Sequence, residues 1–191
     1  DANKIGTAGF SQGGMTSIWL GGAQASLSLE KLREQITVID HPSYRKMHFK
    51  DIPEKHLDVI LKNFTQQDFF EANQSYRDER FKAAFSIAPG IDQKNRVFSI
   101  EGLSKVEIPT SIIIGESDPL IRDAKFFAEH IPNSIFSVIS GKVTHMTLLN
   151  EGTEEGRKTN PEYTCDHSSI SRAKIHQDIG ALAVEFFNER L

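Results

Sequence analysis

The sequence predicts an α/β fold, in which a mostly parallel sheet is flanked by helices. Three runs are continuously apolar and lack the alternation of a half-exposed strand, which is typical of parallel strands buried on both faces. They lie at 81–90, 108–119 and 134–141. Segments with helical periodicity separate or follow these runs, and this alternation favours a layered α/β sheet.

The remaining elements of the predicted fold follow from local patterns. An apolar run at 4–10 ends at glycine and precedes small and apolar residues, which predicts a strand, a sharp turn and a helix. Residues 123–130 are predicted to form a helix that stops before Pro132. The last 20 residues or so, 172–191, are predicted to form an amphipathic helix. Its apolar face consists of Ile175, Ile179, Leu182, Ala183, Phe186 and Phe187.

Residues 24–80 differ from the rest of the chain. They are rich in charge, contain one strongly apolar run at 35–40, and have helical periodicity at 53–64 and 67–76. We therefore expect a mainly helical, cap-like insertion within one domain that spans residues 1–191.

Composition and charge exclude several classes of protein. The net charge is −4 and no basic run occurs, so nothing indicates a surface for nucleic acid or anionic lipid. No apolar stretch approaches the roughly 18 residues of a membrane-spanning helix, so we expect a soluble chain. The single cysteine, Cys165, excludes an intrachain disulfide. It does not distinguish a cytoplasmic protein from an exported one. The oligomeric state is equally open.

Residues 9–13 read G-x-S-x-G, with Ser11 at the centre, between the first predicted strand and helix. In this motif the glycines permit a cramped turn that projects the serine hydroxyl above the sheet edge as a nucleophile. The alternative is a serine that only caps the helix. The backbone N–H of Gln12 is then expected to be one donor of an oxyanion hole, with the second donor on an earlier loop.

A nucleophilic serine needs a base and a carboxylate that orients it, in the chain order Ser, Asp or Glu, His. Asp118 and His145 follow the second and third apolar runs, at the strand ends where ligands meet a parallel sheet. The alternative for Asp118 is a turn former before Pro119. Competing carboxylates are Glu116 and, less strongly, Asp123 and Asp92. The other histidines do not follow a strand downstream of the acid; they are His41, His48, His56, His130, His167 and His176.

The G-x-S-x-G motif lies unusually close to the first residue of the sequence. A nucleophile strand normally lies inside a sheet, yet only ten residues precede Ser11, which leaves one parallel edge unpaired. We expect this chain to be the C-terminal portion of a longer protein.

Five stretches resemble a known family: "IGTAGFSQGG", "FKAAFSIAPG", "IPTSIIIGESDPLI", "THMTLL" and "CDHSSISRAKIHQDIGALAVEFFNERL". They are similar to the predicted dienelactone hydrolase branch of the α/β-hydrolases, which is related to platelet-activating-factor acetylhydrolases. The resemblance implies an α/β-hydrolase fold and an esterase without metal or cofactor. It implies Ser11 as nucleophile, Asp118 as orienting acid and His145 as general base. True dienelactone hydrolases have a cysteine at the position of Ser11.

The expected function is hydrolysis of a small-molecule carboxylic ester through an acyl-enzyme intermediate. The alternatives are an amidase or peptidase with the same three residues, and a non-catalytic binding module with this fold. The insertion is expected to cover the site. Its aromatic residues either line an acyl pocket or pack the insertion onto the body. They are Tyr44, Phe49, Phe64, Phe69, Phe70 and Tyr76.

Overall fold

The computed structural model describes residues 3–33, 62–90 and 97–191. Within them, a 4-stranded sheet has the order β1-β2-β3-β4, and each neighbouring pair is parallel. The strands are β1 (Ile5–Phe10), β2 (Phe81–Ile87), β3 (Thr110–Gly115) and β4 (Ser134–Ile139). Each apolar run of the sequence therefore contains a strand, and the predicted α/β class with a parallel sheet is confirmed.

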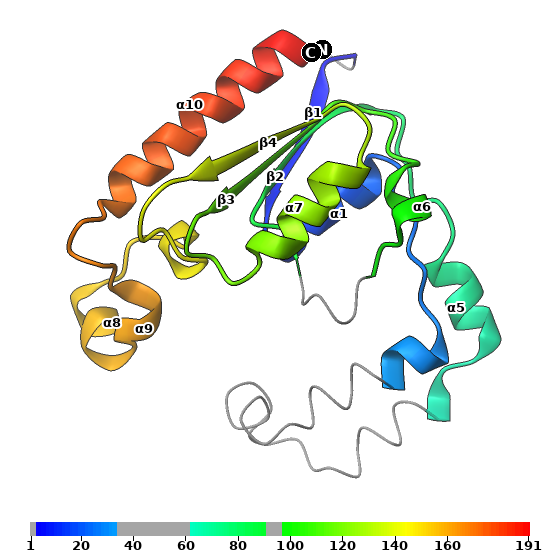
Figure 1. Ribbon diagram of the computed structural model, residues 1–191, viewed down its shortest axis with the longest axis horizontal. Helices are drawn as coiled ribbons and strands as arrows, with labels where there is room; N and C mark the ends of the chain where they lie inside the picture. Colours follow the sequence, from blue (N-terminus) through cyan, green and yellow to red (C-terminus); the bar gives the residue numbers. More distant parts are fainter. Residues whose placement is uncertain (1–2, 34–61, 91–96) are drawn as a thin grey trace.

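Helices flank the sheet on both faces. Figure 1 shows α1 and α7 along one face and α10 along the other. The helices are α1 (Gln12–Leu20), α5 (Gln66–Ala72), α6 (Ile100–Leu103), α7 (Ile121–His130), α8 (Glu154–Thr159), α9 (Pro161–Thr164) and α10 (Arg172–Arg190), with a 3-10 turn, η1, at Met146–Leu148.

One hydrophobic core lies between the sheet and the helices α1 and α7. Ile112 and Ile114 of β3 belong to it, together with Ala84 of β2. They pack with Ile18 of α1 and Phe127 of α7, and none of these five residues is more than 2% exposed. Alternate residues of each strand therefore supply this core.

The intervening residues of the same strands supply a second core, against α10. Phe85 of β2 and Ile113 of β3 pack there with Ile179 and Phe186 of the helix. The ring centroids of Phe85 and Phe186 lie 5.8 Å apart. Because helices cover both faces, these strands have no solvent-facing side, and this explains their continuous hydrophobicity.

Two helices differ from the predictions at their margins. Helix α7 begins at Ile121, two residues earlier than predicted, and gives way to extended backbone at Ile131, since a residue before proline avoids the helical region. On α10, Leu182 is 40% exposed although it belongs to the predicted apolar face. It lines a shallow groove with Ile135 of β4, where the helix reaches the margin of the sheet. The short helices α8 and α9 are not predicted from the sequence.

The predicted insertion at 24–80 is described only in part, because residues 34–61 lie outside the described ranges. The predicted apolar run at 35–40, most of the predicted helix at 53–64, and Tyr44 and Phe49 fall there. The predicted helix at 67–76 corresponds to α5, which ends earlier, at Ala72. Its start is fixed by a capping box in which Thr65 and Asp68 exchange hydrogen bonds.

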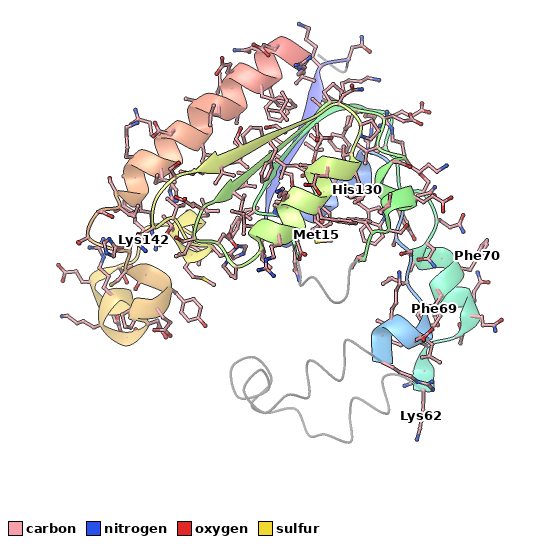
Figure 2. The ribbon with its side chains drawn as sticks, viewed as in Figure 1. Met15, Lys62, Phe69, Phe70, His130 and Lys142 are labelled. Atoms are coloured by element: carbon pink, nitrogen blue, oxygen red, sulfur yellow. The ribbon has the colours of Figure 1, made fainter. Side chains whose placement is uncertain are left out.

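The aromatic residues of this region have different surroundings. No residue of α5 is buried, and Phe69 and Phe70 lie on this helix at a distance from the sheet (Figure 2). Tyr76 instead meets Trp19 of α1 edge to face, with ring centroids 5.6 Å apart. Tyr76 therefore packs against the body of the domain. This agrees with the alternative in which the aromatic residues pack the insertion onto the body.

Replacement of Phe186 by alanine is expected to lower the free energy of unfolding by about 3–5 kcal/mol, because the lost ring leaves a cavity against Phe85. Urea denaturation measures the change. The matched control is Val184→Ala on the same helix, where the side chain is 62% exposed and little change is expected. Equal effects of the two substitutions would contradict the packing of α10 on the sheet.

Candidate active site

Ser11 occupies a strained turn between β1 and α1. Its backbone angles, φ 56° and ψ −115°, lie in a region that residues other than glycine rarely adopt. Two hydrogen bonds hold the turn: the Ser11 N–H donates to the Ile87 carbonyl at 2.9 Å, and the Met15 N–H donates to the Ser11 carbonyl at 3.1 Å. The end of β2 and the start of α1 thus fix Ser11 from both sides.

The two glycines of the G-x-S-x-G motif have unequal surroundings. A β-carbon on Gly9 would lie 2.2 Å from the backbone carbon and oxygen of Gly13, so no side chain fits there. A β-carbon on Gly13 would have nothing within 4 Å. The close approach of strand to helix therefore demands glycine at position 9 and, within the described residues, permits a side chain at position 13.

His145 links Ser11 to Asp118. Its Nε2 lies 3.0 Å from Ser11 Oγ, and its Nδ1 lies 2.8 Å from Asp118 Oδ2. An ionised carboxylate only accepts hydrogen bonds, so Nδ1 carries the proton and Nε2 accepts from the serine hydroxyl. The side chain of Asp118 is fully buried and that of His145 is 15% exposed. The structure thus brings together all three side chains predicted for the site.

Asp118 has two functions in this arrangement. While Oδ2 faces His145, Oδ1 accepts the N–H of Leu120 at 2.8 Å, which is the hydrogen bond of an Asx turn. The interpretation of Asp118 as a turn former and its interpretation as an orienting acid are therefore compatible. The turn hydrogen bond also fixes the orientation of the carboxylate toward the imidazole.

The loops that leave β3 and β4 are hydrogen-bonded to each other beside the site. The Glu116 carboxylate accepts the N–H of Gly141, and the Ser117 hydroxyl donates to the Gly141 carbonyl at 3.1 Å. The Ser117 N–H also donates to the Val143 carbonyl at 3.0 Å. Glu116, the nearest competitor of Asp118, therefore holds the loop that leads to His145, and it is Asp118 that binds the imidazole.

An aromatic ring supports the imidazole from one side. Phe10, the residue between Gly9 and Ser11, has its ring centroid 4.8 Å from that of His145, with 34° between the two planes. The residue before the serine thereby limits the rotation of the histidine.

The backbone N–H of Gln12 lies at the first position of α1. The first hydrogen bond of the helical ladder is the one from Met15 to Ser11, so the N–H groups of Gln12, Gly13 and Gly14 have no carbonyl within the helix to pair with. The positive end of the helix dipole lies at the same place. Both features suit a donor toward a developing negative charge next to Ser11.

The other candidates of the sequence have different surroundings. Asp123 is buried in the first turn of α7. Asp92, His41, His48 and His56 lie outside the described residues. The remaining histidines have other partners. His130 and His167 contact groups within four residues, Phe126 O and Ser169 Oγ, and His176 contacts the carbonyl of Thr147, 29 residues earlier in the chain.

Three residues that the sequence analysis does not assign to the site are hydrogen-bonded together at η1, the turn that His145 caps. Thr147, in η1, is fully buried, and its hydroxyl donates to Asp166 Oδ1 at 2.8 Å. Asp166 pairs with Arg172, and these side chains are only 12% and 5% exposed. All three residues lie in stretches that resemble the known family. No periodicity or motif assigns them to the site, because their contacts form only when η1 and the start of α10 meet.

The surroundings of Asp166 shift its pKa. Burial is the largest single influence and raises the pKa, but the hydrogen bonds from Arg172 and Thr147 and the nearby positive charges outweigh it. The pKa of Asp166 therefore lies below its ordinary value, and the carboxylate stays charged at neutral pH.

The described residues also bear on metal binding and on membrane insertion. No cluster of three or more His, Cys, Asp or Glu side chains there is arranged to hold a metal ion. In the same part of the chain, no helix has both the length and the hydrophobicity to cross a membrane.

No protein-family model matches the chain, and no curated protein matches it. Several solved structures match part of the chain at low similarity. They include an α/β hydrolase from Sphaerobacter thermophilus, with 11% identity over 74% of this chain and a TM-score of 0.33. An enol-lactonase from Burkholderia xenovorans has 11% identity over 73% of the chain and a TM-score of 0.31. A serine hydrolase involved in carbazole degradation has 14% identity over 94% of the chain and a TM-score of 0.33.

The chain spans less than two thirds of each of these structures: 62%, 58% and 64% of their lengths. At these identities and TM-scores, the matches support no conclusion about the fold or the activity of this chain. The parallel sheet flanked by helices, with a sharp strand–serine–helix turn, agrees with the predicted α/β-hydrolase fold class.

Substitution of Gly9 by alanine is expected to lower the free energy of unfolding by about 1–3 kcal/mol, because the new methyl group collides with the Gly13 backbone. The control is Gly13→Ala, which meets open space and replaces a helical glycine. Its stability is expected to stay within about 1 kcal/mol of the wild type. Urea denaturation of both variants tests the difference, and a Gly9→Ala variant as stable as Gly13→Ala would disprove the close approach.

Acidification is expected to destabilise the protein partly through Asp166. Because its folded pKa is lowered, its contribution to stability is complete above the ordinary value of 3.8 and is lost as the pH falls through the folded value. Urea denaturation at several pH values below about 5 should therefore show a shallower decline for Asp166→Asn than for the wild type. Asp178→Asn, at a carboxylate that is 49% exposed, is the control and should keep the wild-type slope. An unchanged slope in Asp166→Asn would refute the assignment.

Proposed function

We propose that this chain provides the active site of a serine hydrolase that cleaves carboxylic esters through an acyl-enzyme intermediate. The observation that supports this best is the continuous hydrogen-bonded series from Ser11 Oγ through the His145 imidazole to Asp118. These atoms come from positions up to 134 residues apart in the chain. Such an arrangement on a strained strand-to-helix turn has the geometry required of a nucleophile, a base and an orienting acid.

In the proposed first step, His145 Nε2 takes the hydroxyl proton as Ser11 Oγ attacks the ester carbonyl carbon. The resulting imidazolium is stabilised by Asp118, which also keeps the proton on Nδ1. The imidazolium then returns the proton to the leaving alcohol as the carbon–oxygen bond breaks. The acyl group remains on Ser11.

In the proposed second step, water attacks the acyl carbon while His145 Nε2 takes a proton from the water. The imidazolium then returns this proton to Ser11 Oγ as the carbon–Oγ bond breaks, which releases the acid and restores the serine. The Gln12 N–H supports both steps as a donor toward the oxyanion. Its place at the first position of α1 adds the helix dipole to that hydrogen bond.

The finer assignment rests on the resemblance to the dienelactone hydrolase branch. We propose an ester of a small molecule as the substrate, because the resemblance implies a serine esterase without metal or cofactor. Amide or peptide hydrolysis uses the same three side chains, and a binding module would keep the fold without the chemistry. The experiment below distinguishes the three.

A fluorophosphonate probe is expected to label the wild-type chain and fail to label Ser11→Ala, because the probe reacts with an activated serine hydroxyl. His145→Ala and Asp118→Asn should slow both labelling and hydrolysis of short acyl nitrophenyl esters by on the order of 10³-fold or more. Intact-protein mass spectrometry measures the labelling. The control is Ser104→Ala, at an exposed serine that only caps α6 and should label like the wild type.

Each outcome assigns the protein to one class. Labelling with faster cleavage of esters than of matched aminoacyl amides supports the proposal. Labelling with preferred amide cleavage replaces the ester by an amide or peptide. A folded wild type that neither labels nor turns over either substrate contradicts a hydrolase and leaves the binding module.

A further inference from the structure

The hydroxyl of Thr147 uses its whole hydrogen-bonding capacity within a few residues of His145. It accepts the N–H of Thr144 at 3.1 Å, lies 3.2 Å from the Thr144 hydroxyl, and donates its own proton to Asp166. A hydroxyl has one proton to donate and two lone pairs, so all three are engaged. The hydrogen bonds between Thr144 and Thr147 thus connect the residues on the two sides of His145, which is the N-cap of η1.

The Arg172 guanidinium is hydrogen-bonded to this turn and to the residues around it. Its five N–H groups all have acceptors: both carboxylate oxygens of Asp166, and the carbonyls of Tyr163, Leu149 and Asn150. Leu149 and Asn150 directly follow η1, so Arg172 binds the turn both through Asp166 and through the backbone. A planar fork with five donors can satisfy all these acceptors, whereas an ammonium group has three donors.

The network is anchored in the core through α10. Arg172 is the first residue of this helix, and His176, one turn later, hydrogen-bonds the Thr147 carbonyl at 3.0 Å. Ile179 and Phe186 of the same helix are buried against β2 and β3. A continuous path of packing contacts and hydrogen bonds therefore runs from the sheet through α10 and η1 to His145.

We propose that Thr147, Asp166 and Arg172 form a positioning network that fixes the imidazole of His145 between Ser11 and Asp118. The proposal rests on the proposed function for its catalytic consequence. None of the three residues contacts Ser11 or Asp118 through a described hydrogen bond, so they act through the position of His145. The loop from β4 must place Nε2 at hydrogen-bonding distance from Ser11, which follows β1 at the other edge of the described sheet, so small displacements of this loop matter.

The test is Thr147→Val, which keeps the shape of the side chain and removes its hydroxyl. In the full chain, kcat for ester hydrolysis is expected to fall about 10- to 100-fold, with KM within about twofold of the wild type, since the base is misplaced and the rest of the site is intact. The matched control is Thr110→Val, another fully buried threonine, whose hydroxyl donates to the Ile108 carbonyl at the opposite end of β3. It loses one hydrogen bond of a buried hydroxyl and should keep the wild-type kcat.

A second readout does not depend on activity. The proton on His145 Nδ1, bonded to a buried carboxylate, should give a far-downfield resonance in the proton NMR spectrum, identified by its loss in His145→Gln. The resonance is expected to broaden or disappear in Thr147→Val and to persist in Thr110→Val. If the wild type hydrolyses no ester, the proposed function fails. The resonance of the His145 proton then shows by itself whether Thr147 positions the imidazole.

Two results would overturn the inference. In one, Thr147→Val keeps both the kcat and the resonance of the wild type. In the other, Thr110→Val loses as much as Thr147→Val, which would reduce the effect to general destabilisation. Circular dichroism and urea denaturation establish that both variants are folded before they are compared.

Discussion

The parallel alignment of four strands sets the distances that the site must bridge. The carboxyl ends of β1 to β4 lie at one edge of the sheet, and neighbouring strands are about 4.8 Å apart. Ser11 follows β1 and His145 follows β4, so the last loop must return across roughly 14 Å, three strand spacings. The hydrogen bonds of Gly141 and Val143 with the loop after β3 guide this return.

The features predicted from the sequence are those encoded in short segments. A strand buried on both faces is apolar throughout, so the apolar runs identify β2 and β3. The third run identifies β4, but the expectation that this strand is also buried on both faces is wrong, because β4 lies at the edge of the described sheet and its Ile135 and Val138 are 40% and 41% exposed. The turn at Ser11 is recognisable because only glycine tolerates the approach of Gly9 to the Gly13 backbone. Asp118 and His145 are identifiable because each follows a strand and the chain order suits the chemistry.

Features that depend on contacts between distant segments were not predictable in this way. Glu116 and Asp118 are two residues apart and both follow β3, so Glu116 remains a competitor of Asp118 in the sequence; their different partners appear when the loops meet. Asp166 and Arg172 belong to a polar stretch and a helix start, and nothing local marks them as buried. The exposure of Leu182 likewise reflects where α10 meets the margin of the sheet, and the periodicity of the helix does not contain that information.

The ring of Phe10 has a consequence for how solvent reaches the imidazole. It covers one face of His145, and 15% of the histidine side chain remains open. Solvent therefore reaches the imidazole only over this remaining part of its surface. A substrate that covered this part would leave the histidine to exchange its proton with the reacting groups and not with bulk water.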